Sequence, residues 1–306
     1  MDRAIERKKI IIDTDIGDDI DDHMAIALAA KSPELQIVGV TTVHGDVAAR
    51  AAMARKELDA FSLKDVPVCE GCEHPLTGKR YSYYKPEIWE GSDLGTYSSN
   101  LKEAADFIVQ TIAKDPDTVI VCMGPLTNIA CAVELKPEVM EKATVYAMGG
   151  AFDSAFPEYN ISKDPEAAEI VINGVSDIRF FGLELTTKCF FDTEDLYITI
   201  KNFPDPIATV AQKVDLWLCE IGYSNLYLHD AFPICALISP NRFTYKKVLA
   251  KVERKGKHTR GTMVYDPGYF HQENSEFNIQ IAQMKTPSIV TSLFEKRVFG
   301  VKIPRE

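Results

Sequence analysis

The chain has 306 residues, of which 34 are Lys or Arg and 45 are Asp or Glu, so its formal net charge at pH 7 is −11. Hydrophobic residues make up 46% and charged residues 26%, a balance that supports a large core and argues against an intrinsically disordered chain. The acidic balance, without a Lys- or Arg-rich segment, also argues against nucleic acid as a partner, because binding to a phosphate backbone requires cations.

Two further features predict a cytoplasmic protein that does not bind membranes. No apolar run approaches the roughly 20 residues that a membrane-spanning helix needs, and the first residues, MDRAIERKK, lack the apolar segment of a signal peptide. The seven cysteines, scattered mostly through apolar surroundings, are typical of buried thiols in a reducing compartment.

Short apolar runs alternate with helical patterns through the first two thirds of the chain. Apolar runs lie at 8–13, 36–43 and 118–124, and the helical patterns that follow them lie at 23–31, 47–61 and 126–135. This order predicts βαβ units and a mainly parallel sheet with helices on both faces. The fold class is therefore α/β.

Further strands are expected in the runs that end at Met148 and Leu185. A helix is expected from about Pro206 to Glu220, a short helix after Asp230, and β-rich segments at about 247–253, 262–265 and 277–284. No Gly/Ser-rich or Pro-rich linker divides the chain. We therefore predict one domain, residues 1–306, with an open, mainly parallel but mixed sheet.

Six aspartates follow the first predicted strand, at positions 13, 15, 18, 19, 21 and 22. Carboxylates that close repel one another, so they must be protonated or share a cation. Calcium, with its flexible shell of oxygen ligands, suits an acidic loop better than magnesium does. Capping of the following helix explains Asp21 and Asp22 but not all six, and an EF-hand is disfavoured because a strand precedes the loop.

A phosphatase of the haloacid dehalogenase type is an alternative interpretation of the same segment. Such enzymes also have two aspartates, two positions apart, after an apolar strand, and Asp13 would then form an aspartyl-phosphate. The later Lys and acidic pair that this interpretation requires have no convincing counterpart in the sequence.

Asp13-Thr-Asp15-Ile-Gly17, followed by Asp21-Asp22 before a helical pattern, resembles the signature of the inosine-uridine preferring nucleoside hydrolase family, with two extra residues between its halves. The resemblance continues in order through VTTVHGD (40–46), GPLTNIA (124–130), AMGG (147–150), PEYNISKDPEAAEIV (157–171), GLELT (182–186), LHD (228–230) and TRGTMVYD (259–266). It implies a Rossmann-like fold, a homodimer or homotetramer, and hydrolysis of the N-glycosidic bond of ribonucleosides to ribose and free base.

The resemblance also implies a set of site residues. Calcium would be held by Asp15, Asp22, the backbone carbonyl of Thr127 and Asp230. Asp15 would take a proton from a calcium-bound water that attacks the anomeric carbon, and His229 would protonate the departing base. The substrate would contact Asp21, Asp46, Met148, Glu158 and Asn160.

Several positions depart from the family pattern and keep two alternatives open. Asp46 stands where the family commonly has Asn, and the segment 151–157 lacks the Gly-Asn expected to hold the ribose 5′-hydroxyl. A hydrolase of a modified ribosyl compound, or a calcium-dependent protein that binds nucleosides or related ribosyl ligands with little turnover, would fit these changes. Glu90 stands where the family often has a His, and the nearby Tyr81, Tyr83, Tyr84 and Trp89 are either base contacts or exposed loop aromatics. Tyr223 and Tyr227, whose spacing would put both on one face of a helix, are either base contacts or core residues.

Overall fold

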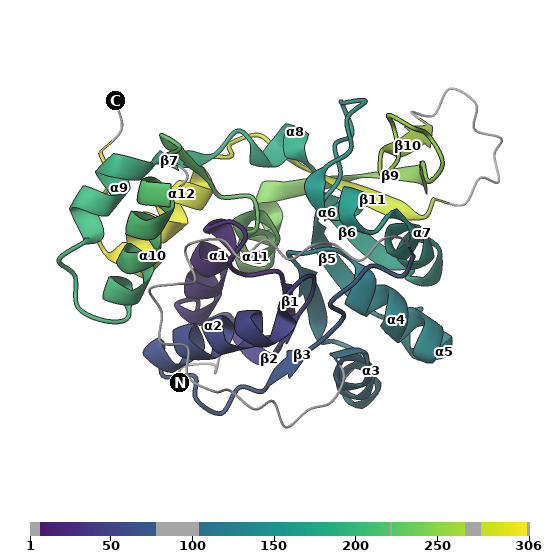
Figure 1. Ribbon diagram of the computed structural model, residues 1–306, viewed down its shortest axis with the longest axis horizontal. Coiled ribbons are helices and arrows are strands. Elements are labelled where there is room, and N and C mark those ends of the chain that lie inside the picture. The colour runs from purple at the N-terminus through teal and green to yellow at the C-terminus, as the bar shows by residue number, and fades with distance from the viewer. Residues whose placement is uncertain (1–6, 78–103, 221, 267–276, 305–306) are drawn as a thin grey trace.

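The computed structural model describes residues 7–77, 104–220, 222–266 and 277–304, and the elements named below lie in these ranges (Figure 1). The strands are β1 (Lys8–Thr14), β2 (Leu35–Thr42), β3 (Val68–Glu70), β4 (Val119–Cys122), β5 (Thr144–Met148), β6 (Asp177–Phe181), β7 (Phe190–Asp192), β8 (Asn225–Tyr227), β9 (Phe243–Val252), β10 (Met263–Asp266) and β11 (Ile279–Met284). The α-helices are α1 (Asp21–Ala30), α2 (Val47–Ala60), α3 (Ala104–Lys114), α4 (Thr127–Leu135), α5 (Pro137–Met140), α6 (Tyr159–Lys163), α7 (Pro165–Gly174), α8 (Leu183–Thr186), α9 (Thr193–Ile200), α10 (Ile207–Glu220), α11 (Ala231–Ile238) and α12 (Ile289–Leu293).

Nine strands of the described ranges form one sheet, in the order β10-β9-β11-β6-β5-β4-β1-β2-β3. Neighbouring strands from β11 to β3 run parallel, whereas β9 runs antiparallel to both β10 and β11. The mixed, mainly parallel sheet predicted from the sequence is therefore confirmed. Because the parallel strands point the same way, their carboxyl ends meet at one edge, where open α/β sheets bind ligands.

Helices cover both faces of the sheet, as Figure 1 shows. Successive side chains of β1 point to opposite faces, so Ile10 and Ile12 join one apolar cluster and Ile11 joins the other. The first cluster includes side chains of α1, α2 and α11, and the second includes side chains of α3, α4 and α7. Burial on both faces explains why three consecutive residues of this strand are isoleucine.

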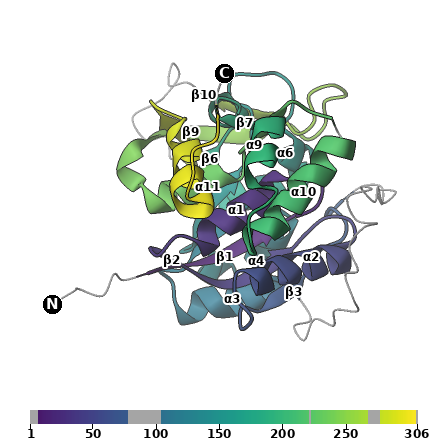
Figure 2. The same cartoon turned by 90° about the vertical axis from the view of Figure 1, so that its left-hand side faces the viewer.

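Elements α9, α10, β7 and β8 determine where the segment before α11 lies. Helix α10 packs against α1 and α9 (Figure 2). Strand β7 pairs antiparallel with β8. Strand β8 ends at Tyr227, and the following residues lead into α11, which packs against α1. This path brings His229 and Asp230 to the loop that follows β1.

Two local predictions are wrong, both where a short apolar pattern fits more than one structure. The run expected to continue as a strand to Leu185 stops with β6 at Phe181, because Gly182 is the N-cap of the short helix α8. Tyr223 and Tyr227 do not share a helix face. Gly222, with a φ of 68°, follows the end of α10, and Tyr227 belongs to β8. The other predicted helices and strands are confirmed in type and approximate position.

Most buried apolar side chains of the described residues belong to one of these two clusters. Within those residues, no helix is long and apolar enough to cross a membrane. The seven cysteines all lie in the described ranges, and they are free thiols, mostly buried or half-buried.

A buried amide joins β1, β2 and the loop after β3. The Asn128 side chain donates to Asp13 Oδ1 at 2.7 Å and to the Thr42 carbonyl oxygen at 3.0 Å, and its Oδ1 accepts from the Cys72 backbone amide at 2.8 Å. Thr41 donates to the same Asp13 oxygen at 2.5 Å. Because Asn128 is fully buried, water cannot replace it as a partner.

We expect Asn128→Ala to lower the free energy of unfolding by about 2–4 kcal/mol, because it leaves buried donors and acceptors unpaired. Urea denaturation followed by circular dichroism measures the loss. Asn173→Ala is the matched control: Asn173 is exposed and its amide donates to a carbonyl within α7, so the change should stay below about 0.5 kcal/mol. Equal losses in both variants would contradict the structural role given to Asn128.

Candidate functional site

A cavity of about 310 Å³ opens where the chain leaves the carboxyl ends of β1, β4 and β5. Its volume lies at the lower end of the range found for small-molecule sites. The residues that line it are Asp15, Asp18, Asp19, Asp21, Asp22, Met123, Met148, Glu158, Tyr159, Asn160, Leu183, His229 and Asp230. The lining therefore includes all the residues predicted for catalysis, metal binding or sugar binding except Asp46 and Thr127.

Two glycines allow the acidic loop, residues 15–20, to turn its side chains into the cavity. Gly17 has a φ of 108°, in the left-handed region that residues with a side chain rarely adopt. Gly124, which follows β4, packs against Asp15, and a Cβ atom at this glycine would lie only 2.9 Å from Asp15 Oδ1. A side chain at position 124 would therefore displace Asp15.

Three buried carboxylates converge at the bottom of the cavity. Asp21 and Asp22 begin α1 and Asp230 precedes α11, and one oxygen atom of each lies within 4.8 Å of the others. The Thr14 hydroxyl donates to Asp22 Oδ1, and the Asp230 amide donates to Asp21 Oδ2 at 3.2 Å. Oxygen ligands at this spacing fit a hard cation such as calcium. Asp15 lines the same cavity but is not part of this group of three.

Burial and mutual repulsion raise the pKa values of these carboxyl groups. Burial raises the pKa of Asp21 to about 7. It also raises the pKa values of Asp15, Asp22 and Asp230 well above the ordinary value, and the negative charges of neighbouring aspartates add to the effect. Ionising all of them together is costly, and a bound cation would offset that cost. The donor set and its electrostatics therefore fit the predicted calcium site.

Glu158 and Asn160 also line the cavity. The Glu158 carboxylate caps α6 by accepting from the backbone amides of Asn160 and Ile161 at 2.8 and 3.1 Å, and it also accepts from Gly150 at 3.1 Å. The Asn160 side chain donates to the carbonyl oxygens of Met123 and Met148, at 2.9 and 3.3 Å. Both side chains are therefore fixed relative to the ends of β4 and β5.

His229 enters the cavity from the segment between β8 and α11. Its Nδ1 atom lies 2.7 Å from the Thr186 hydroxyl oxygen, and its ring stacks on Tyr227 with centroids 5.5 Å apart. Burial lowers the pKa of His229, whereas the negative charge of Asp19 opposes this effect. The imidazole is thus held in one orientation by contacts on two sides.

The predicted metal or sugar contacts Asp46 and Thr127 lie outside the cavity lining, and so do the predicted base contacts Tyr223 and Tyr227. The Asp46 carboxylate caps α2 by accepting from the Ala49 backbone amide at 3.0 Å. Thr127 begins α4, and its hydroxyl donates to Asp164 at 2.8 Å. The substrate contact predicted for Asp46 and the metal ligand predicted in the Thr127 carbonyl stay predictions.

The geometry disfavours the phosphatase interpretation. Asp13 is fully buried within β1, its Oδ1 is held by Thr41 and Asn128, and it does not line the cavity. An aspartate that forms a phosphoenzyme must be reached by the phosphate of its substrate.

Sequence reasoning assigned no role to several residues that line the cavity. Tyr159 lies between two predicted site residues, and that position is a signal, whereas Met123 and Leu183 lie within apolar runs that predict strands and carry no signal. Asp18 and Asp19 would take the place of Asp21 and Asp22 if the family signature were matched without the two extra residues, but the helical pattern after Asp22 favours the match with them. The predicted aromatic contacts at 81–89 and Glu90 lie outside the described residues.

The chain resembles known proteins over most of its length. The sequence model of the family described as inosine-uridine preferring nucleoside hydrolase matches residues 10–290, a range that contains every residue of the cavity lining. A protein named probable uridine nucleosidase 1, from Oryza sativa subsp. japonica, is 34% identical over 285 residues, which are 85% of this chain and 86% of the relative.

Two further comparisons agree with this match. The inosine-uridine preferring nucleoside hydrolase of Crithidia fasciculata is 31% identical over 281 residues, which are 85% of this chain and 88% of the relative. The solved structure of a plant nucleoside hydrolase matches with a TM-score of 0.82 and 26% sequence identity, over 95% of this chain and 99% of the other.

We expect calcium to stabilise the protein more at about pH 8 than at about pH 5, because its ligands must lose protons. In the metal-free protein, burial raises the folded-state pKa values of Asp22 and Asp230, two predicted ligands, well above the ordinary value of 3.8. The stability that their protons contribute to the folded protein is complete below the ordinary pKa, and it is lost as the pH rises through the raised folded-state values. Calorimetric melting temperatures of chelator-treated protein, with and without calcium chloride, test this. An equal shift at both pH values would contradict it.

Proposed function

Because this chain belongs to the inosine-uridine preferring nucleoside hydrolase family, we propose that it hydrolyses the N-glycosidic bond of ribonucleosides to ribose and free base with calcium as its cofactor. The observation that carries the proposal is the single cavity in which three buried carboxylates share a lining with His229 and Glu158. Names of relatives point to uridine and inosine as the first substrates to test. We also infer a homodimer or homotetramer from the family resemblance.

In this proposal Asp15, Asp22, Asp230 and the Thr127 carbonyl hold calcium. Bound calcium supplies a Lewis acid that lowers the pKa of coordinated water and binds sugar hydroxyl groups. A carboxylate oxygen of Asp21 lies within 4.8 Å of carboxylate oxygens of Asp22 and Asp230, and in this proposal Asp21 binds a ribose hydroxyl group.

Asp15 accepts the proton of the attacking water. A general base works best when its pKa lies near the working pH, and burial moves the pKa of Asp15 upward from the ordinary carboxyl range. Gly124 leaves room for the Asp15 side chain, so the carboxylate is held close to the end of β4. The proton acceptor is therefore in a fixed place.

Glu158, Asn160 and Met148 hold the sugar from the other side. Cleavage of an N-ribosidic bond develops positive charge on the ribose, as in the oxocarbenium-like states of glycosidases. Carboxylate and amide oxygens fixed nearby stabilise that charge without reorganising during the reaction. The hydrogen bonds that fix Glu158 and Asn160 to the strand ends support this role.

His229 protonates the departing base. A nucleobase leaves as an anion unless it receives a proton, and an imidazole is a suitable acid near neutral pH. The hydroxyl of Thr186 and the ring of Tyr227 orient the imidazole in the cavity. Burial lowers the pKa of His229, and the negative charge of Asp19 offsets part of that effect by favouring the protonated form.

We expect the wild-type protein to release ribose from uridine or inosine only with calcium, and Asp15→Asn to lower kcat by about 10²–10⁴-fold. A reducing-sugar assay measures both. Asp117→Asn is the matched control, because Asp117 is exposed in the turn before β4 and should keep full activity. Thermal stabilisation by nucleosides without ribose release would instead support the ribosyl-binding protein. Release only from 5′-modified nucleosides would support a modified substrate.

We expect His229→Ala to slow the cleavage of uridine and inosine by about 10²-fold or more, because the leaving base then departs without a proton. A riboside of p-nitrophenol has a leaving group that departs as a stable anion, so its cleavage should change by less than about ten-fold. Steady-state kinetics on both substrates separate the two effects. A loss of the same size on both would show that His229 does not act as the acid.

A further inference from the structure

Arg50 is a buried cation beside the acidic loop, and the proposed reaction does not use it. It lies in the first turn of α2, its side chain is only 4% exposed, and it does not line the cavity. A buried guanidinium is costly unless its donors are paired. The groups that accept from it therefore indicate what it holds in place.

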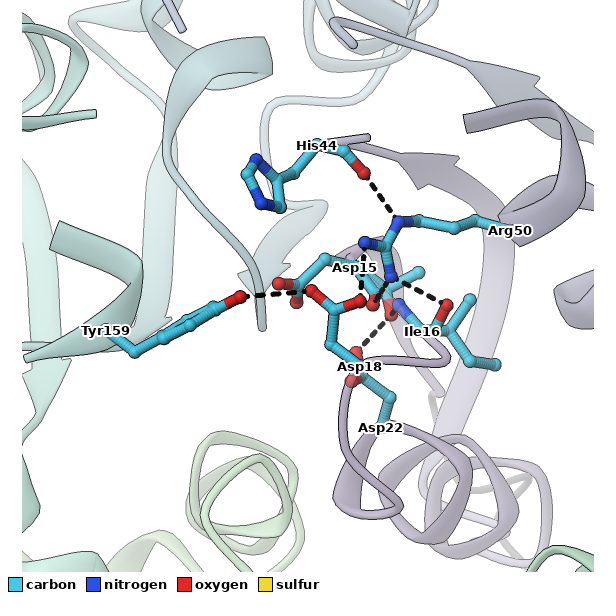
Figure 3. A network of polar contacts seen from close by, with 8 residues as sticks. Asp15, Ile16, Asp18, Asp22, His44, Arg50 and Tyr159 are labelled. Atoms are coloured by element: carbon cyan, nitrogen blue, oxygen red, sulfur yellow. Dashed lines mark hydrogen bonds and ion pairs between the residues drawn. The ribbon is translucent and has the colours of Figure 1, made fainter. Parts of the chain in front are cut away.

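Two nitrogen atoms of Arg50 bind the acidic loop, as Figure 3 shows. Nη1 donates to the backbone carbonyl oxygens of Asp15 and Ile16, the latter at 3.0 Å. Nη2 donates to Asp18 Oδ1 at 2.8 Å and forms an ion pair with it. One guanidinium thus contacts three residues of the loop, two of them through the backbone.

The remaining nitrogen of Arg50 contacts the turn after β2. Nε donates to the His44 carbonyl oxygen at 2.6 Å. His44 has a φ of 67°, a left-handed conformation that is unfavourable for a residue with a side chain. Such a turn persists where surrounding contacts stabilise it, and Arg50 provides one of these contacts. It therefore ties the end of β2 to the loop after β1.

Asp18 extends this contact across the cavity. Its Oδ2 atom accepts from the Tyr159 hydroxyl at 3.2 Å, while its Oδ1 atom is bound to Arg50. Tyr159 begins α6, next to Glu158 and Asn160. Asp18 also lies in the stretch where this chain has two residues more than the common family pattern. The longer loop is therefore held from both sides.

We propose that Arg50 is a positioning residue that fixes the acidic loop so that Asp15 and the start of α1 are in place before calcium binds. It acts through the backbone carbonyls and Asp18, and not by contact with substrate. This inference rests on the proposed function, because that proposal assigns the carboxylates to calcium.

Charge and geometry make opposite predictions for the loss of Arg50. A cation beside the carboxylates repels calcium, so on charge alone a neutral residue at this position would strengthen calcium binding. Arg50 as a positioning residue lowers the cost of ordering the ligands, so its loss would weaken binding. Lysine keeps the charge but lacks the planar fork that reaches four separate acceptors. The pair Arg50→Lys and Arg50→Met therefore separates the two effects.

The test is a calorimetric titration of chelator-treated protein with calcium alone. We expect both variants to bind calcium about 10–100-fold more weakly than wild type, as residues that orient metal ligands typically do when replaced. At saturating calcium the kcat of Arg50→Lys on uridine or inosine should return to within about three-fold of the wild-type value, because the metal then orders the loop.

Arg55→Lys is the matched control. Arg55 lies on the same helix and likewise donates to a carboxylate and to backbone carbonyls, those of Asp59, Leu63 and Val66. These groups lie outside the cavity lining, so calcium affinity should equal that of wild type even if the melting temperature falls. Weakened binding in Arg55→Lys of the same size as in Arg50→Lys would overturn the inference.

Three other results are decisive. Unchanged affinity in Arg50→Lys with tighter binding in Arg50→Met would overturn the inference, because Arg50 would then act only through its charge. If neither Arg50 variant folds, the calcium affinity of Tyr159→Phe is measured instead. A calcium affinity about two- to five-fold weaker than that of wild type supports the inference, because this variant loses only the hydroxyl that donates to Asp18. An unchanged calcium affinity overturns the inference. Absence of calcium binding by wild type would overturn the proposed function itself, and this inference with it.

Discussion

The negative charges of the carboxylates buried in the cavity must be neutralised, and the arrangement of the surrounding residues depends on how this chain neutralises them. Asp21, Asp22 and Asp230 place oxygen atoms within 4.8 Å of one another, and burial raises their pKa values. A protein that keeps such a cluster needs protons, a fixed cation or a metal ion to offset the repulsion. Arg50 supplies a fixed positive charge beside the cluster, and the proposed calcium ion supplies the rest.

The fold brings these groups together from distant parts of the chain. The parallel strands place the acidic loop, Met123 and Met148 at one edge of the sheet, and the connection from β8 to α11 adds His229 and Asp230. Polar contacts then fix each side: Asn160 is bonded to the ends of β4 and β5, and Arg50 to the loop after β1. The site is therefore built largely from fixed groups, which is what electrostatic stabilisation of a developing charge requires.

Much of this arrangement is visible in the sequence because it follows local patterns. Three isoleucines in a row predict a doubly buried strand, and the aspartates after it predict a cation site, to which family resemblance adds Glu158, Asn160 and His229. Other features depend on tertiary contacts that carry no local signal. In the sequence, the buried Arg50 looks like any arginine of a surface helix. Gly182 similarly ends β6 within a pattern that fits a longer strand.

The most direct test of the account is a crystal structure of the protein grown with calcium chloride and ribose. The account predicts one calcium ion in the cavity, bound by carboxylate oxygens of Asp15, Asp22 and Asp230 and by hydroxyl groups of the sugar. It also predicts that Glu158 and Asn160 contact the opposite side of the ribose. An ion bound elsewhere, or a ribose in the cavity without any ion at these carboxylates, would contradict the central claim.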